Sequence, residues 1–73
     1  MDKLLWDVNK VKAVKASLVT VVNVYQKVGD TMWKVMGSYT QGGHAEWICF
    51  GAYKKEAEAR QRMIEVVEAI NAV

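Results

Sequence analysis

Three side chains with metal-binding or nucleophilic chemistry lie close together in the sequence: His44, Glu46 and Cys49. An imidazole, a carboxylate and a thiolate could together hold a transition metal, and a cysteine beside a histidine could act as a nucleophile. The pattern of the surrounding segment predicts a β-strand, in which successive side chains point to opposite faces. His44 and Glu46 would then share one face and Cys49 the other, so the spacing disfavours a shared metal site.

Other signs of catalysis or cofactor binding are missing from the sequence. His44 is the only histidine, and it follows a glycine pair in a turn, where a solvated side chain is the usual outcome. Cys49 falls in mid-strand and is expected to be a buried, unreactive thiol. Gly42-Gly43 lacks both the pattern and the strand–helix context of a phosphate-binding loop. We therefore expect no enzyme, no cofactor and no metal.

Five elements in series are expected to position these residues. Apolar residues spaced three or four apart over residues 3–15 predict an amphipathic helix, although the valines there also allow an edge strand. Valine, threonine and aromatic residues predict three strands, at residues 17–27, 31–40 and 45–52. The connections between these strands are short and rich in glycine, so the strands should form an antiparallel meander.

The C-terminal segment, residues 54–72, has the periodicity of an amphipathic helix. Its apolar face is expected to consist of Ala59, Met63, Val66, Val67 and Ile70. The predicted fold is therefore a single α+β domain over residues 1–73, in the order α-β-β-β-α, with the last helix packed on one face of the sheet.

Composition narrows the class of protein further. The chain has 73 residues, of which 52% are hydrophobic, with one cysteine and a net charge of +2. So short a chain has a marginal core and no internal disulfide, so we expect it to be stabilised by a partner or by self-association. The longest uncharged stretch, residues 16–26, is too short to span a membrane. One cysteine and no export signal fit a reducing cytoplasm.

Both faces of the predicted sheet carry apolar side chains, and one helix covers only one face. We expect an aromatic surface to stay uncovered around Tyr25, Trp33, Tyr39 and Trp47, with Lys34 and His44 at its rim. Exposed apolar patches usually mark interaction sites, and aromatic residues are enriched in interface cores. The predicted partner-binding site consists of Trp33, Tyr39 and Trp47, with Lys34 and His44 at the rim. The alternative is that the N-terminal helix covers this face and makes Trp47 part of the core.

Nucleic-acid binding is the second possibility. Lys27, Lys54 and Lys55 lie one or two residues after tyrosines, and aromatic side chains beside lysine can stack on bases. The α-β-β-β-α order and the lysine pair resemble the double-stranded RNA-binding domain, and the strand–helix junction is similar to that of the arm-binding domain of tyrosine integrases. This chain has Glu58 where the first family has a further lysine, and its sheet is far less basic than that of the second. Nucleic acid is therefore the less favoured partner.

The end of the chain carries another resemblance. An apolar strand, a glycine, a tyrosine, a charged step and a helix follow one another in Ile48-Cys49-Phe50-Gly51-Ala52-Tyr53 and Lys54-Lys55-Glu56-Ala57-Glu58-Ala59-Arg60. Over residues 18–72 the chain resembles small phage and prophage proteins that look like a β-meander closed by a helix. It departs from them at Lys54 and Lys55, where they often have the serine or threonine that favours a helix start.

The resemblance implies a role as well as a fold. Several phage accessory families of this size inhibit bacterial defence systems, including CRISPR effectors, by occupying a functional surface in the host cytoplasm. The leading prediction is therefore a small non-enzymatic protein-binding module, a stoichiometric inhibitor of a defence complex. A nucleic-acid-binding domain and a structural homodimer are the alternatives.

Overall fold

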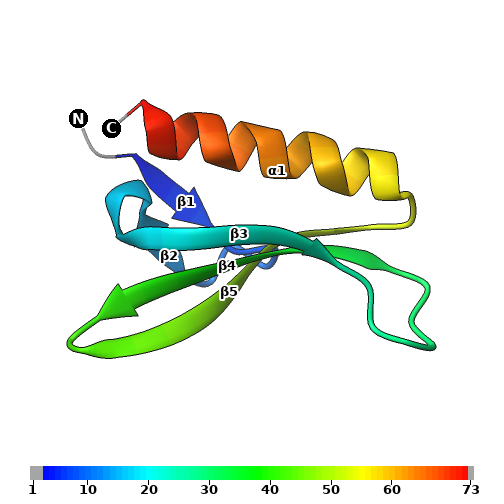
Figure 1. The fold of residues 1–73 in the computed structure, drawn as a ribbon, viewed down its shortest axis with the longest axis horizontal. Coiled ribbons are helices and arrows are strands. Elements are labelled where there is room, and N and C mark those ends of the chain that lie inside the picture. Colours follow the sequence, from blue (N-terminus) through cyan, green and yellow to red (C-terminus); the bar gives the residue numbers. More distant parts are fainter. Residues whose placement is uncertain (1–2, 73) are drawn as a thin grey trace.

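The computed structural model describes residues 3–72 as a three-stranded sheet with one helix packed lengthwise on it and a small hairpin beside them (Figure 1). The elements are β1 (Leu4–Trp6), β2 (Ala13–Lys15), a short 3₁₀ helix η1 (Ala16–Leu18), β3 (Val19–Tyr25), β4 (Trp33–Gln41), β5 (His44–Tyr53) and α1 (Glu56–Asn71). Strands β1 and β2 pair with each other, and β3, β4 and β5 form an antiparallel sheet in that order. The predicted α+β class, the meander and the C-terminal helix are confirmed.

The predicted N-terminal helix over residues 3–15 is wrong, and the α-β-β-β-α order with it. This segment is a β-hairpin in which Leu5 lies opposite Val14, and both are buried. The connection between its strands contains Lys10 at φ 56°, and the carboxylate of Asp7 accepts a hydrogen bond from the backbone N–H of Val11 at 2.9 Å. Valine favours strands, and an aspartate that bonds its own turn favours the hairpin, so these preferences outweigh the helical spacing.

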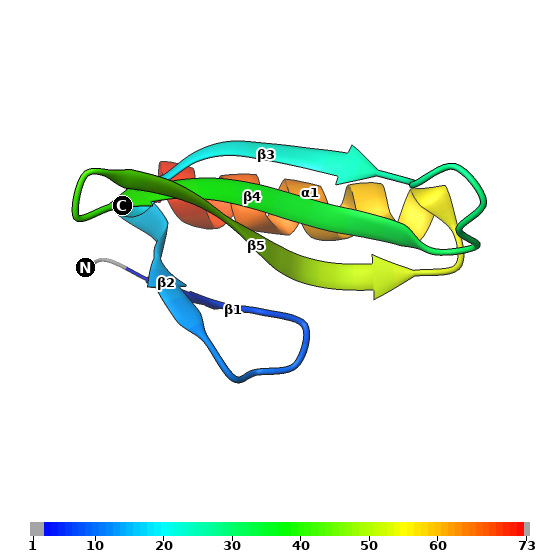
Figure 2. The same cartoon turned by 90° about the horizontal axis from the view of Figure 1, so that it is seen from below.

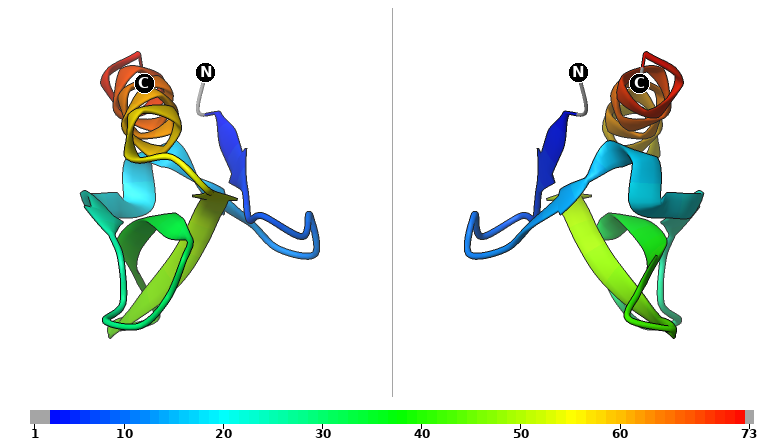
Figure 3. Two further views of the ribbon diagram at one scale, coloured as in Figure 1. Left: turned by 90° about the vertical axis from the view of Figure 1, so that its right-hand side faces the viewer. Right: turned by 90° about the vertical axis from the view of Figure 1, so that its left-hand side faces the viewer.

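The hairpin stands beside β5 and α1 (Figure 3). The backbone N–H of Val8 donates a hydrogen bond to the carbonyl of Cys49 at 2.9 Å, which joins the hairpin connection to β5. The alternative prediction of an edge strand in residues 3–15 is closer to the observed hairpin than the helix is. The two strands of the hairpin, however, form a sheet of their own.

The register of β4 with β5 follows from the turn at Gly42-Gly43. Both glycines have positive φ, 60° and 82°, as a two-residue type I′ hairpin turn requires. Between the turn and the bulge described below, even-numbered residues of β4 lie opposite odd-numbered residues of β5, so that Ser38 lies opposite Trp47. Directly opposed residues share a face of the sheet, so the turn decides which side chains gather on each face.

A bulge interrupts this pairing near the end of β5. Val35 lies opposite Gly51, and the register then shifts and leaves Phe50 as the extra residue. The Nε–H of Arg62 donates a hydrogen bond to the carbonyl oxygen of Phe50 at 3.5 Å. The bulge is thus tied to α1 through a backbone group that the strand ladder leaves free.

Two glycines of the sheet make room for aromatic rings on the helix-facing side. The ring of Phe50 lies against Gly37 so closely that a Cβ at position 37 would collide with it. A Cβ on Gly51 would lie 2.7 Å from the ring of Tyr53. Neither glycine has a positive φ, so both are needed for close approach of the rings rather than for a turn.

The core lies between α1, the hairpin and the helix-facing side of the sheet. Its buried apolar residues are Leu5, Val14, Ala16, Val19, Val35, Tyr39, Ile48, Phe50, Ala59, Val66 and Ala69. Of the predicted helix face, Ala59 and Val66 are buried, and Met63 and Ile70 pack against the core. Val67 is exposed instead, and Ala69 is buried, because α1 is rotated so that its Ala59–Val66–Ala69 line faces the sheet.

Helix α1 begins after Lys55, which occupies the N-cap position without a side-chain capping bond. Arg60 and Glu56 form an ion pair at 2.7 Å one turn apart on its exposed surface. In the part of the chain that the structure describes, no helix is long and apolar enough to cross a membrane.

Candidate interaction surface

The side of the three-stranded sheet that faces away from α1 is not covered by any described element (Figure 2). We call it the open face. Its cross-strand rows are Val21–Ser38–Trp47, Asn23–Met36–Cys49 and Tyr25–Lys34–Ala52, continued by Thr40 and Ala45. Each row follows from the antiparallel register, since opposed residues point to the same side.

Large apolar side chains from both edge strands, β3 and β5, are exposed on the open face. Trp47 is 58% exposed, Tyr25 50% and Val21 49%, and Met36 is partly buried between them. Scattered exposed apolar residues are common, but these lie on adjacent rows of one uncovered face. Contiguous patches of this kind mark interaction sites.

The single aromatic surface expected from the sequence does not form. Trp47 and Tyr25 lie on the open face, but Trp33 and Tyr39 lie on the side that faces α1 and the hairpin. Tyr39 is 1% exposed and Trp33 packs against the core. The two-residue turn gives this result, because it pairs Trp47 with an even-numbered residue of β4, whereas Trp33 and Tyr39 are odd-numbered.

Of the two residues expected at the rim, only Lys34 is on the open face. Its Nζ lies 3.8 Å from a carboxylate oxygen of Asp30. His44 is exposed at the start of β5, and strand alternation directs its side chain to the opposite side from Trp47. Within residues 3–72 no group of histidine, cysteine and acidic residues is arranged to hold a metal ion.

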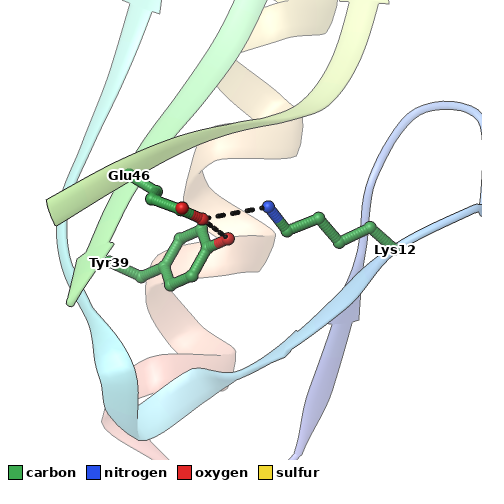
Figure 4. Close-up of polar contacts among 3 residues, drawn as sticks. All are labelled: Lys12, Tyr39 and Glu46. Atoms are coloured by element: carbon green, nitrogen blue, oxygen red, sulfur yellow. Dashed lines mark hydrogen bonds and ion pairs between the residues drawn. The ribbon is translucent and has the colours of Figure 1, made fainter. Parts of the chain in front are cut away.

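Tyr39 instead anchors a polar cluster on the covered side of the sheet (Figure 4). Its hydroxyl donates a hydrogen bond to Glu46 Oε2 at 2.7 Å, and Lys12 Nζ lies 3.4 Å from the same oxygen. The ammonium group also lies 4.8 Å from the centre of the Tyr39 ring, within cation–π range. Lys12 belongs to the hairpin connection, so the cluster fastens the hairpin to β4 and β5.

The cluster shifts the pKa values of two of its members. The hydrogen bond from Tyr39, with Lys12 second, lowers the pKa of the Glu46 carboxyl below its ordinary value. The pKa of the Lys12 ammonium group is raised, mainly by Tyr39 and to a smaller extent by Glu46. Both shifts favour the charged forms, as expected for hydrogen-bonded neighbours of opposite charge.

The lysines expected to contact nucleic acid lie together at one end of the molecule. Lys27 is in the connection from β3 to β4, and Lys54 and Lys55 are in the connection from β5 to α1. Both connections lie at the same end in two perpendicular views (Figures 1 and 2). All three side chains are exposed. They flank the open face at its Tyr25 end rather than line it.

Val21 and Met36 belong to the open face but were missed as functional candidates by sequence reasoning. The signal that could have found Met36 is the Gly42-Gly43 turn, because a two-residue loop alone sets which residues of β4 lie beside Trp47. Met36 then follows as the neighbour of Ser38 along β4 on the same side. Val21 lies on β3, whose register with β4 this turn does not set.

A scan against protein-family models and searches of curated proteins and of solved structures gave no match to this chain. Its function is therefore argued from the geometry and chemistry of its own residues.

Proposed function

We propose that this chain is a protein-binding module that docks a protein partner on the open face. One observation carries the proposal: Trp47, on the edge strand β5, is 58% exposed on a sheet face that no described element covers. Tryptophan, tyrosine and methionine are enriched in the cores of interfaces, and a few such residues dominate binding free energy. Trp47, Tyr25 and Met36 are the anchors, and the paired strands hold them rigidly.

The charge of the open face favours protein over nucleic acid as the partner. Lys34 is the only charged residue among those that define the face, and Asp30 lies beside it. Binding to a nucleic-acid backbone requires several lysines or arginines that neutralise phosphates. A face of aromatic, aliphatic and hydroxyl groups instead suits the apolar core of a protein interface.

The partner that we propose is a complex of a bacterial defence system. This part of the proposal rests on the resemblance of residues 18–72 to small phage proteins. The chain would act stoichiometrically, because a bound module of this size blocks the surface it occupies.

Capture of a partner from a bacterial lysate, with matched variants of the bait, tests the proposal. We expect Trp47→Ser and Tyr25→Ser to lose a partner that the unmodified chain retains. Val28→Ser is the control, because Val28 is also apolar and is 99% exposed but lies in a loop outside the open face. Capture that survives Trp47→Ser, or that is lost equally in Val28→Ser, would show that the open face is not the docking surface.

A second candidate function is nucleic-acid binding through the lysine end. The observation that favours it is the gathering of Lys27, Lys54 and Lys55 on two connections that are far apart in sequence. A labelled duplex should then shift at low salt, with a strong salt dependence. Replacement of the three lysines by glutamine should abolish the shift, whereas Trp47→Ser should leave it. Absence of any shift at low salt removes this candidate.

A further inference from the structure

The outer edge of β3 is unusually open for an edge strand. β3 pairs only with β4, so every second N–H and C=O group of its backbone points away from the sheet. Its sequence, VTVVNVY, has no charged residue and no proline. Soluble proteins usually protect such edges with lysine, proline, bulges or a covering segment, because an open edge pairs readily with another strand. The one irregularity, between Val19 and Val21, leaves the remainder regular.

The other strand edges of the described chain are protected. On β5, the hydrogen bond from Val8 to the Cys49 carbonyl occupies the edge, and the hairpin lies beside it. Strands β1 and β2 have only three residues each; β1 begins directly after Lys3, and β2 ends at Lys15. Very short strands and neighbouring lysines are both devices that prevent edge pairing. β3 alone combines length, regularity and lack of charge.

We propose that a second copy of this chain pairs with β3 in antiparallel orientation and joins the two three-stranded sheets into one. Two identical antiparallel strands are related by a two-fold axis, so one contact satisfies both copies and the assembly closes as a dimer. The β3 edge is therefore complementary to itself. For this reason the partner that we propose is a second copy of the chain and not a strand of another protein.

A register centred on Asn23 suits the side chains on both faces. Val21 of one copy lies opposite Tyr25 of the other on the open face, and Val22 lies opposite Val24 on the helix-facing side. Pairs of β-branched and aromatic residues are favourable cross-strand neighbours. At the axis Asn23 meets its own counterpart, and two amide side chains can donate to and accept from each other.

The flank of α1 supports the same interface. Ile64 and Val67 are 46% and 39% exposed and lie three residues apart on one flank. The opposite flank, which carries Arg62 and Glu65, lines a groove of about 560 Å³ against β1. Helix periodicity therefore turns Ile64 and Val67 away from β1, to the β3 side. The two-fold axis places both helices on one side of the joined sheet, with the flanks that carry Ile64 and Val67, and also the exposed Arg60, turned toward each other.

Dimerisation through β3 and docking on the open face share Tyr25, but Trp47 belongs to the docking surface alone and Asn23 to the dimer axis. The open faces of the two copies become continuous across the axis, and Trp47, on the far edge strand β5, stays free. Either proposal can therefore fail without the other.

Sedimentation equilibrium of the full chain and three variants tests this inference. The unmodified chain should have a mass of about twice 8.2 kDa, falling toward 8.2 kDa on dilution. Asn23→Lys should be a monomer of unchanged circular dichroism, because it sets two like charges opposite each other at the axis while its side chain stays exposed. Thr40→Lys, a matched exposed lysine on the central strand, should remain dimeric, as should Trp47→Ser.

Three results would overturn the inference. The first is a mass of 8.2 kDa for the unmodified chain at every concentration. The second is a dimer that survives Asn23→Lys. The third is a dimer that dissociates in Trp47→Ser but not in Asn23→Lys, which would mean that two open faces pack together instead of two β3 edges. Amide exchange supplies a second readout: alternate amides of β3 should become protected as the protein concentration rises.

Discussion

The two faces of the β3–β4–β5 sheet contain similar residue types, but one face is buried and the other is exposed. On the covered face, Val35 and Tyr39 are almost fully buried, and glycines admit the rings of neighbouring aromatic residues. On the open face, Trp47 and Tyr25 are half exposed or more. Residue type therefore does not distinguish buried from exposed aromatic residues in this protein. The strand register does, and the register depends on a turn of two glycines.

The largest effect should come from removal of the Tyr39 side chain. Tyr39→Ala leaves a cavity in the core and removes the hydrogen bond to Glu46, so the free energy of unfolding should fall by roughly 3–5 kcal/mol. Urea unfolding followed by circular dichroism measures the change. A loss as small as that of an exposed tyrosine, for which Tyr25→Ala is the reference, would contradict the burial of Tyr39.

Alanine substitutions at two neighbouring positions of β4, one on each face, should differ in their effect on stability because only one of them causes a steric clash. Gly37→Ala places a methyl group against the ring of Phe50, so it should reduce the free energy of unfolding by about 1–3 kcal/mol. Ser38→Ala, one residue away on the open face, should change it by no more than about 0.5 kcal/mol. Equal effects of the two alanine substitutions, measured by the same unfolding experiment, would mean that the faces are not distinct.

The hairpin contact predicts a dependence on pH. Because the pKa of Glu46 is lowered in the folded chain, its contribution is present above the unfolded pKa and is lost as pH falls through the folded pKa. Lys12 has a raised pKa, so its contribution is lost only as pH rises through that value in alkali. Thermal unfolding should show a Tm that is level at neutral pH and lower in acid.

Glu46→Gln provides the control for this pH effect, because it removes the carboxyl group but keeps a hydrogen-bond acceptor for Tyr39. The variant should have a weaker acid dependence of Tm than the unmodified chain. An acid dependence identical in the two chains would assign the effect to other carboxyl groups.

Much of the fold can be predicted from the sequence. Where the prediction fails, the failure has a physical cause. Valine-rich segments and a periodic C-terminal segment predict the three strands and the helix because these patterns are local. Residues 3–15 have a spacing that fits a helix, and the hairpin there is stabilised by distant contacts, such as that of Lys12 with Glu46. The bulge at Phe50 likewise depends on packing against α1.

The candidate site was only partly predictable for a related reason. Of the predicted site residues, Trp47 and Lys34 lie on the open face, but Trp33, Tyr39 and His44 do not. Side chains alternate between the two faces along each strand, but the face on which each set lies depends on how the strands are paired. The pairing of β4 with β5 near the turn could be predicted from Gly42-Gly43. The two bulges, which place Val19 and Tyr53 on the helix-facing side, could not be predicted from the sequence.

The most direct test of the contrast between the faces uses Trp47→Ser and measures two quantities on the same variant. The free energy of unfolding should change by no more than about 0.5 kcal/mol, because the side chain is exposed in the folded chain. Capture of the protein partner should be lost. A fall in stability of about 3 kcal/mol or more, the cost of removing a core aromatic residue, together with undiminished capture, would show that Trp47 is structural and that the open face is not the binding surface.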